Sequence, residues 1–367
     1  MMGRLKLEMH KEVCMNKFHF STVCIVLGTN CNFNCRYCMQ HTGIKQPIEN
    51  ANNFEKIKPF IKEVKPKKIL LWGGEPLLYW DKFKEVVLFV RSIDRDINIV
   101  TITNGSLLTQ EKVDFFNKYN VGIGLSNDAF ATQDTRFNDV LSSKKIFNLF
   151  KQIHSKGINT VISARTQDIY KVWQYYDEKF PNEHINVNFD MLKNFTKDKF
   201  LGDFDLNKFQ VTLNKLKQGF VKSVLSNDFN SREFSFFLPL ISLTNKQVQL
   251  PQYKTLHHLK CGTMDSVIIV DFKGNIYKCK NSNEIIGNIG NLEQAKECLE
   301  SKINIPSWCL GCPYEFICDT VGCVVETDEI KRNSCVINKM VYKTFFESLD
   351  CISNILNKSS QTALNKK

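Results

Sequence analysis

Three cysteines near the amino end have a spacing that suits metal chemistry. Cys31, Cys35 and Cys38 stand as C-x3-C-x2-C directly after a β-rich run. Thiolates select zinc, copper(I) or iron–sulfur clusters, and a structural zinc site usually needs four ligands. His41 is the only other plausible ligand nearby, which leaves a Cys3His zinc site as an alternative. A cubane cluster held by three cysteines would instead leave one iron open to a substrate or cofactor.

The cysteines fall into two groups along the chain. Of the 14, five lie in 14–38, none in 39–260 and nine in 261–351. The amino end has no apolar segment of the secretory kind, so we expect a cytoplasmic protein whose closely spaced thiols are metal ligands. For the isolated cysteines we expect burial instead. These are Cys14, Cys24, Cys298 and Cys351.

Composition and charge limit the function classes. The 367 residues are 43% hydrophobic and 24% charged, as expected for a globular protein of enzyme size. No apolar run approaches the ~20 residues of a membrane span, so we expect no membrane partner. The net charge of +11 predicts either an acidic partner or compensation for bound anionic clusters. We interpret the lysines at 62–68 as a solvated face and expect no nucleic acid.

Short β-rich runs alternate with helical segments between about residues 20 and 190. Repeated βα units predict a parallel sheet, and six units are too few for a closed eight-stranded barrel, leaving an open barrel or a doubly wound sheet. We expect Gly157 to follow the end of a helix and Asn159 to open the next strand. The β-rich runs are 22–27, 68–72, 97–103, 121–126, 159–164 and 185–191. Apolar stripes at i, i+3, i+4 and i+7 predict two of the helices, with Phe83, Val86, Val87 and Val90 on one and Ile146, Leu149, Phe150 and Ile153 on the other.

Polar and glycine-rich segments follow four of these runs. In a sheet of this kind, chemistry collects at the carboxyl ends of the strands, so we expect the four segments to face one mouth. They are 28–30 with the three cysteines, 73–76, 104–105 and 127–128.

The first two of these segments resemble the radical S-adenosylmethionine (SAM) enzymes. The cysteine motif carries Tyr37 before its last cysteine, and Gly73-Gly74-Glu75-Pro76 resembles the GGE(P) motif that binds the methionyl amino group of SAM in that family. The resemblance implies a partial (β/α)6 TIM-like barrel, SAM and one 4Fe-4S cluster. It also implies the SAM-binding residues, with Tyr37 on adenine and other contacts from Gly73, Gly74, Glu75, Asn104, Ser126, Asp128 and Arg165. Ala129 follows Asp128 where the family more often has glycine.

The resemblance implies a mechanism as well. In the family, SAM chelates the open iron, and an electron from the reduced cluster cleaves the sulfonium bond to C5′. The resulting 5′-deoxyadenosyl radical takes a hydrogen atom from an unactivated C–H bond, which requires a closed mouth that excludes water and thiols.

Seven cysteines of the second group resemble the SPASM domain, which carries two auxiliary 4Fe-4S clusters in many radical SAM enzymes that modify peptides. The chain departs from the family in having four residues, rather than the usual three, before Cys323. The resemblance assigns one complete cluster to Cys309, Cys312, Cys318 and Cys335, and another to Cys261, Cys279 and Cys323. The fourth position of the second cluster is either an open iron or a ligand such as His257, His258 or Cys298. A zinc knuckle at Cys309, Cys312, Cys318 and Cys323 is the alternative.

The remaining segments complete the expected organisation. Apolar spacing predicts one helix over 209–220 and a docked C-terminal helix over 337–349, whereas 227–253 shows no readable motif. In 256–335 we expect metal ligation to replace a hydrophobic core. The expected domains are an N-terminal extension over 1–20, a radical SAM partial barrel over 21–250, a SPASM domain over 256–335, and a helix with tail over 336–367.

These features favour a radical SAM maturase that modifies a peptide or protein side chain by a thioether or carbon–carbon crosslink, an epimerisation or an oxidation. A flavodoxin or ferredoxin is the expected electron donor. Sulfatase maturases place an aspartate directly after the second SPASM cysteine, where this chain has Lys280. Only thirty residues precede Cys31, so we expect any leader recognition to be external or to use 191–255. The alternatives are a dehydrogenase of an aminosugar or cyclitol and, from another class, a non-catalytic scaffold that binds nucleic acid.

Overall fold

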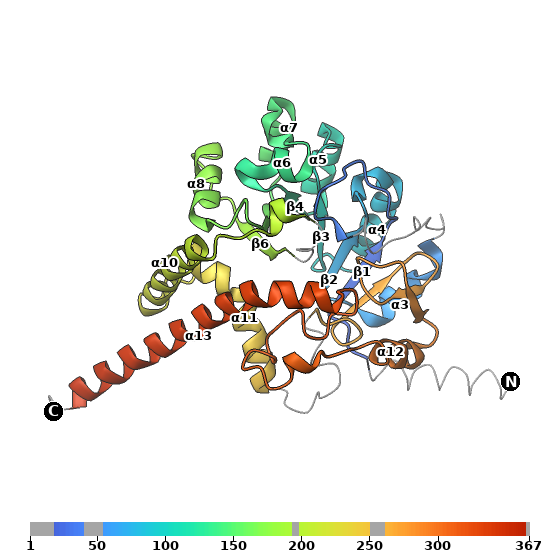
Figure 1. The fold of residues 1–367 in the computed structure, drawn as a ribbon. Coiled ribbons are helices and arrows are strands. Elements are labelled where there is room, and N and C mark those ends of the chain that lie inside the picture. The colour runs from blue at the N-terminus through green and yellow to red at the C-terminus, as the bar shows by residue number, and fades with distance from the viewer. Residues whose placement is uncertain (1–17, 40–53, 193–197, 250–260, 365–367) are drawn as a thin grey trace.

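The structure is a computed structural model that describes residues 18–39, 54–192, 198–249 and 261–364 (Figure 1). Several residues named above lie outside the described ranges. They are Cys14, His41, His257 and His258.

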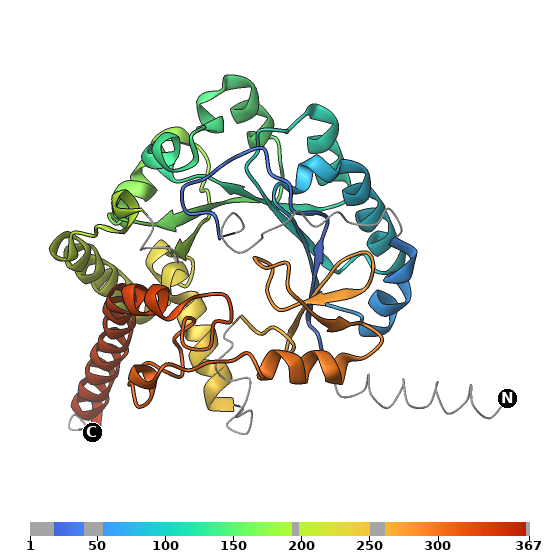
Figure 2. The same cartoon turned by 45° about the vertical axis from the view of Figure 1, so that its right-hand side comes forward.

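Six parallel strands form a curved sheet in which each strand pairs with the next along the chain. Helices connect the strands and lie on the outside of the curve (Figure 2). The prediction of a partial (β/α)6 barrel is therefore confirmed. The strands are β1 (Thr22–Val26), β2 (Lys68–Trp72), β3 (Asn98–Thr103), β4 (Val121–Ser126), β5 (Lys156–Ile162) and β6 (Val187–Met191). The outer helices are α3 (Lys58–Val64), α4 (Trp80–Ile93), α5 (Gln110–Lys118), α6 (Thr132–Arg136), α7 (Lys144–Lys151) and α8 (Ile169–Lys179).

The barrel core comes from alternate strand residues that meet the apolar faces of these helices. The parallel register sets Val23 opposite Ile69 and Ile25 opposite Leu71, and all four are buried. Helix α4 buries the predicted apolar stripe, which includes Phe83. Parallel strands need crossovers that cover the sheet, which is why helical segments follow every strand of this half.

The predicted start of the fifth strand is wrong. Helix α7 ends at Lys151, and β5 already begins at Lys156, so Gly157 lies inside the strand. A Cβ on Gly157 would stand 3.2 Å from the backbone oxygen of Asn186, which explains a glycine in the middle of a strand. Ile153 is buried, as its spacing predicted, but lies beyond the helix.

The cysteine-rich part of the chain extends the same sheet. Strand β7 (Val267–Val270) pairs in parallel with β1, and the antiparallel strands β8 (Asn275–Tyr277) and β9 (Ile285–Asn288) follow it. Ile268, Phe272 and helix α12 (Leu292–Glu300) bury apolar side chains in the barrel core. The expectation that metal ligation replaces a hydrophobic core in 256–335 is therefore wrong for residues 267–300. The following stretch, 301–327, contains little regular structure.

Three long helices pack together beside the barrel. The predicted helix over 209–220 is α10 (Leu206–Leu225), and the C-terminal helix is α13 (Asp328–Leu364), which starts early enough to include Cys335. Helix α11 (Arg232–Gln249) was not predicted, because Pro239 and a run of adjacent aromatic residues hide its period. A short helix, α9 (Lys199–Gly202), precedes them.

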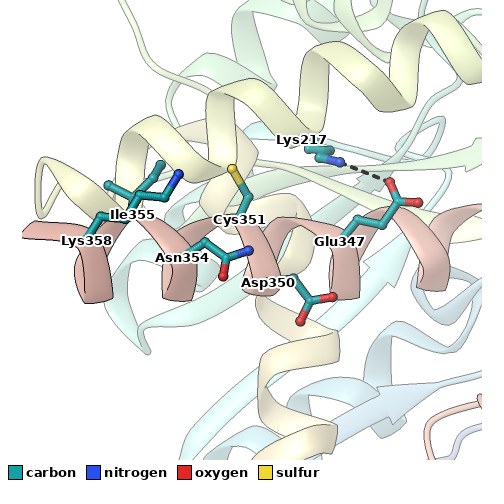
Figure 3. Close-up of a pocket in the computed structure, with 7 residues that line it drawn as sticks. All are labelled: Lys217, Glu347, Asp350, Cys351, Asn354, Ile355 and Lys358. Carbon is teal, nitrogen blue, oxygen red and sulfur yellow. Dashed lines mark hydrogen bonds and ion pairs between the residues drawn. The ribbon is translucent and has the colours of Figure 1, made fainter.

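The isolated cysteines differ in burial. Cys24 is buried in β1, as expected, whereas Cys298 and Cys351 are half-buried. Cys351 lies in a pocket between α10 and α13, where Lys217 forms a 3.0 Å ion pair with Glu347 (Figure 3). Within the described ranges, none of the helices has the length and apolar character needed to cross a membrane.

Replacement of Phe237 tests the packing of the unpredicted helix α11. The Phe237 ring is fully buried against Phe220 and Phe345. We expect Phe237→Ala to lower the free energy of unfolding by about 3–5 kcal/mol, because a large core cavity remains. Urea denaturation followed by circular dichroism measures the change. The matched control is Leu238→Ala, whose side chain is 46% exposed and whose loss should change the free energy of unfolding by only about 0.5 kcal/mol.

Candidate active site

The loop that follows β1 carries the three cysteines and lies against the loop that follows β2. The Gly74 amide donates to the Gly28 carbonyl at 3.1 Å, and the Glu75 amide donates to the Asn30 carbonyl at 2.9 Å. A Cβ on Gly73 would stand 2.5 Å from the Gly28 oxygen, and one on Gly74 would stand 2.3 Å from the Asn30 oxygen. The two glycines are therefore required by the contact between the loops. Close approach to a ligand, the role implied by resemblance, stays a prediction.

Glu75 joins the second loop to the third. Its carboxylate accepts hydrogen bonds from the Leu77 amide at 3.0 Å, the Thr103 hydroxyl at 2.6 Å and the Asn104 amide at 2.8 Å. Burial raises the pKa of the Glu75 carboxyl above its usual value, and the three donors act in the opposite direction. The Glu75 carboxylate thus joins the ends of β2 and β3. Its contact with the amino group of SAM, implied by resemblance, remains a prediction.

Asn104 joins the third loop to the cysteine loop. Its side-chain amide donates to the Asn32 side-chain oxygen at 2.8 Å, and its own oxygen accepts from the Ser106 amide and hydroxyl. Asn32 in turn donates to the Ser106 hydroxyl at 2.8 Å. This network holds the chain between Cys31 and Cys35 against the end of β3.

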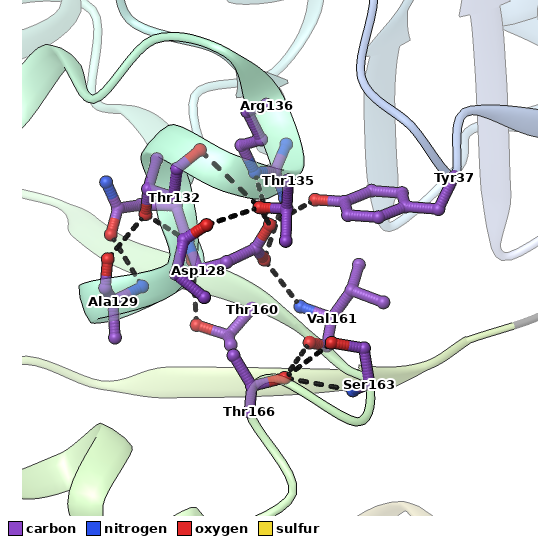
Figure 4. Close-up of polar contacts among 12 residues, drawn as sticks. Tyr37, Asp128, Ala129, Thr132, Thr135, Arg136, Thr160, Val161, Ser163 and Thr166 are labelled. Atoms are coloured by element: carbon purple, nitrogen blue, oxygen red, sulfur yellow. Dashed lines mark hydrogen bonds and ion pairs between the residues drawn. The ribbon is translucent and has the colours of Figure 1, made fainter. Parts of the chain in front are cut away.

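Tyr37 connects the cysteine loop to the end of β4 through Asp128 (Figure 4). The Tyr37 hydroxyl donates to Asp128 Oδ2 at 2.5 Å, and the Asp128 carboxylate also accepts from the Thr135 hydroxyl and the Val161 amide. Arg136 forms a buried ion pair with Asp128 at 3.0 Å.

Burial by itself lowers the pKa of the Arg136 guanidinium, but the Asp128 carboxylate raises it above the usual value. Burial raises the pKa of Tyr37, which keeps the phenol neutral. Five donor atoms from four residues surround the Asp128 carboxylate, two of them from Arg136, so this side chain stabilises the fold. The ribose contact implied by resemblance remains a prediction.

Ala129, at the position where the family more often has glycine, keeps a left-handed backbone with φ of 53°. An alanine in this conformation costs about 1–2 kcal/mol. The Ala129 amide donates to the Asn127 side chain at 3.0 Å and to the Tyr176 hydroxyl at 2.9 Å, which holds the strained turn in place. The departure from the family motif thus leaves a positive-φ turn intact.

Arg165 does not join the other predicted contacts. Its guanidinium lies 4.6 Å from the centre of the Phe200 ring and 4.0 Å from Asp134, and its side chain is about half exposed. Nearby, Arg36 donates from its backbone amide to the Thr135 carbonyl, which anchors the cysteine loop to α6. A SAM carboxylate contact for Arg165 stays a prediction.

A pocket of about 270 Å³ lies at the mouth of the barrel. The cysteine loop lines it with Tyr37 and Cys38, and the predicted residue Ser126 lines it from β4. Sequence reasoning missed other lining residues because they follow no motif. These are Met39, Trp72, Ile102, Arg136, Asn159, Val161, Asp190, Met191, Leu192 and Asn281. Lys280 also lines the pocket, with its ammonium 4.2 Å from the centre of the Trp72 ring. For Asn159, Val161 and Met191 a signal was available, because alternate residues of a strand face the same side of the sheet.

The thiols of the first motif are electrostatic neighbours. Burial raises the pKa of Cys35 to about 11, and the charges of Cys38 and Cys31 also raise it. Among the described residues, no three Cys, His, Asp or Glu side chains are gathered tightly enough to hold a single metal ion. The all-thiol donor set at the mouth fits an iron–sulfur cluster.

The second group contains four thiols that also influence one another. Burial raises the pKa of Cys309, and Cys318, Cys335 and Cys312 raise it further through their charges. This proximity suits the cluster that the resemblance assigns to the same four residues. For the other assigned set, the Cys279 sulfur accepts a hydrogen bond from the Asn281 amide at 3.4 Å, beside the pocket. The grouping of Cys279 with Cys261 and Cys323 stays a prediction.

The barrel, the cysteine loop at its mouth and the glycine contact behind it define a radical SAM fold. Comparison with known proteins agrees, since residues 25–166 match the model of the radical SAM superfamily. This part of the chain is therefore similar to the radical SAM superfamily, and a solved structure with bound AdoMet shares its fold.

Three relatives show the extent of the likeness. The chain is 23% identical to the radical SAM cyclopropyl synthase TigE of Paramaledivibacter caminithermalis over 75% of this chain, and it spans 60% of TigE. It is 23% identical to the cysteine-type anaerobic sulfatase-maturating enzyme of Clostridium novyi, over 87% of this chain and 92% of that enzyme. The structure of anSMEcpe with bound AdoMet and the Cp18Cys peptide has a TM-score of 0.64 at 18% identity, covering 91% of this chain and 99% of that one.

Replacement of Asp128 tests the buried ion pair. Asp128→Asn leaves the Arg136 charge buried without its counter-charge, so we expect the free energy of unfolding to fall by about 3 kcal/mol. Chemical denaturation measures the change. Asp134→Asn is the control, because its 55%-exposed carboxylate should contribute less than about 1 kcal/mol. Equal effects of the two variants would contradict this account.

Replacement of Gly74 tests the contact between the first two loops. We expect Gly74→Ala to displace the cysteine loop and to lower the iron content of the reconstituted protein by about four irons per chain. A colorimetric iron assay measures the loss. Gly290→Ala is the matched control, since a Cβ there meets no atom closer than 3.7 Å. Full iron loading of Gly74→Ala would show that the loop tolerates the shift.

Proposed function

We propose that the chain is a maturase that uses radical SAM chemistry to modify a side chain of a peptide or protein. The observation that carries the proposal is the pocket at the mouth, where the cysteine loop meets Lys280 and Asn281 of the cysteine-rich segment. A substrate in this pocket would touch both cysteine-bearing parts of the molecule. The modification would be a thioether or carbon–carbon crosslink, an epimerisation or an oxidation.

The mouth offers a place for the SAM cofactor and its cluster. In the proposal Cys31, Cys35 and Cys38 hold a 4Fe-4S cluster, and the SAM contacts come from Tyr37, Gly73, Gly74, Glu75, Asn104, Ser126, Asp128 and Arg165. When bound, this pair supplies a carbon-centred radical able to take a hydrogen atom from an unactivated C–H bond. The rigid contacts of Tyr37 and Glu75 keep the loops in one arrangement, and the apolar side chains of Trp72 and Ile102 limit access of water.

The substrate-facing wall of the pocket carries charge and amide groups. Lys280 presents an ammonium over Trp72, and Asp190 presents a carboxylate without a described hydrogen-bond or ion-pair partner. Such groups suit the backbone and polar side chains of a peptide. The full-length likeness to an enzyme named for sulfatase maturation, and to a structure with a bound peptide, supports a peptide substrate. Lys280, where sulfatase maturases place an aspartate, argues for a different modification.

The cysteine-rich segment would bind two further clusters. Cys309, Cys312, Cys318 and Cys335 would hold one, and Cys261, Cys279 and Cys323 the other. The second would lie near the pocket, because Asn281 lines the pocket and donates to the Cys279 sulfur. The proposed roles are to bind a substrate thiolate or to accept an electron after hydrogen abstraction. A flavodoxin or ferredoxin would supply the electron that starts each turnover.

Cleavage of SAM tests the enzyme class. We expect the anaerobically reconstituted protein with dithionite to form 5′-deoxyadenosine from SAM, and about 12 irons per chain when three cubane clusters are loaded. The triple variant Cys31→Ala, Cys35→Ala and Cys38→Ala should form none and should contain about four irons fewer. Chromatography and an iron assay measure both quantities. The proposal fails if the unchanged protein and the triple variant give equal amounts of 5′-deoxyadenosine.

The substrate class is tested with a short cysteine- or aromatic-rich peptide encoded beside the gene. We expect a mass change after incubation with the enzyme and SAM, and a loss of two hydrogens would identify a crosslink or an oxidation. The triple cysteine variant is the control. Cleavage of SAM without any change in such peptides would favour the dehydrogenation of a small metabolite.

A further inference from the structure

One face of α13 lies along the cysteines of the second group. Lys331, Cys335, Asn338 and Tyr342 follow one another at spacings of four, three and four residues, which places them in one stripe of the helix. The cysteine-bearing loop over 301–327 leads directly into this helix (Figure 2). The stripe contacts this loop at both ends, through Lys331 and Tyr342.

The residues on both sides of Asn338 belong to this thiol group or lie near it. Cys335 belongs to it, and Lys331 is close enough for its charge to lower the pKa of Cys309 against the larger effects of burial and the other thiols. At the other end of the stripe, the Tyr342 hydroxyl interacts with the Cys318 sulfur. The Lys331 ammonium donates to the carbonyls of Asn304 and Val321 at 3.0 and 3.3 Å, which attaches this end of the stripe to the loop.

Asn338 differs from its neighbours in one respect. Its side chain is only 2% exposed, yet neither its amide nitrogen nor its amide oxygen has a hydrogen-bond partner in the part of the chain that the structure describes. An unpaired polar group in the interior costs about 1–3 kcal/mol. A leucine would fill the same space without that cost, so the asparagine needs a partner other than the residues that the structure describes.

We propose that the Asn338 side-chain amide donates a hydrogen bond to a sulfur of the iron–sulfur cluster held by Cys309, Cys312, Cys318 and Cys335, and thereby raises the reduction potential of that cluster. The inference rests on the auxiliary cluster of the proposed function. An N–H donor stabilises the more negative, reduced cluster more than the oxidised one. Asn338 would act only by changing the reduction potential of the cluster, and it would touch no substrate.

The test is a redox titration followed by electron paramagnetic resonance in the absence of SAM and peptide. The full chain carries Cys31→Ala, Cys35→Ala and Cys38→Ala, so that only auxiliary clusters contribute. We expect Asn338→Leu to disfavour reduction about tenfold, which corresponds to a potential lower by about 59 mV for a one-electron couple. Asn338→Asp should shift the potential further in the same direction, since it replaces the donor by a negative charge.

Asn333→Leu is the matched control. Asn333 lies on the same helix, but its side chain is exposed, so its replacement should leave the potential unchanged. Unchanged potentials in Asn338→Leu and Asn338→Asp, at full iron content, would overturn the proposal. Retention of the wild-type iron content in protein lacking Cys309 and Cys335 would overturn it as well, because no cluster would then stand beside Asn338.

A second measurement covers the case in which the Asn338 variants fail to fold or to bind iron. Protein that keeps Asn338, carries the three cysteine replacements together with Cys279→Ala, and contains 15N-labelled asparagine should show 15N hyperfine coupling to the reduced cluster in pulsed resonance spectra. The Cys279 replacement removes the ligand to which the Asn281 amide donates. Absence of that coupling contradicts the proposed hydrogen bond. Neither measurement depends on SAM cleavage or peptide modification. A negative result for Asn338 therefore does not contradict the proposed function, and a failure of the proposed function does not change the meaning of these measurements.

Discussion

Backbone contact between the first two loops of the barrel is the constraint on which the mouth depends. The hydrogen bonds from Gly74 to Gly28 and from Glu75 to Asn30 leave no space for a side chain between the two loops. Because these loops are joined, the carboxyl ends of β1 and β2 lie side by side at the mouth, with Val26 opposite Trp72. The cysteine loop then extends across the mouth, where Asn32 reaches the third strand end through Asn104.

The same sheet also brings the second group of cysteines toward the mouth. Strand β7 pairs with β1 in parallel, so the cysteine-rich segment enters the molecule as a continuation of the barrel. The hairpin that follows carries Lys280 back to Trp72 at the end of β2, where its backbone oxygen accepts from the indole nitrogen at 3.0 Å. Strand pairing therefore helps to position the cysteines of this segment, in addition to any metal that they bind. That arrangement could not be predicted from the spacing of the cysteines alone.

The sequence was sufficient for regular, local features and insufficient for features that need distant partners. Strands β1 to β4 and the stripe on α4 follow from short-range alternation and helical period, and the GGE segment identified the second loop. The start of β5 was misplaced because Gly157 looks like a helix terminator, although it permits close approach of the neighbouring strand. Helix α11 was missed because Pro239 interrupts its period. The sequence could not predict that Asp190 and Lys280 line the same pocket, because they are ninety residues apart and only the barrel brings them to one site.

The polar side chains around the mouth divide into two sets, and the division bears on what the site can recognise. Glu75 and Asp128 are buried and surrounded by donors from the chain, so their charges stabilise the loops. Ser126, Asn159 and Asp190 line the pocket without hydrogen bonds or ion pairs from their side chains to other described residues. Groups already satisfied within the fold contribute little to discrimination between substrates, whereas unsatisfied groups in a pocket gain from a matching ligand. Because Ser126 is a proposed SAM contact, selectivity for the substrate should reside in Asn159 and Asp190 together with the Lys280 ammonium, and differences between related enzymes should concentrate at those positions.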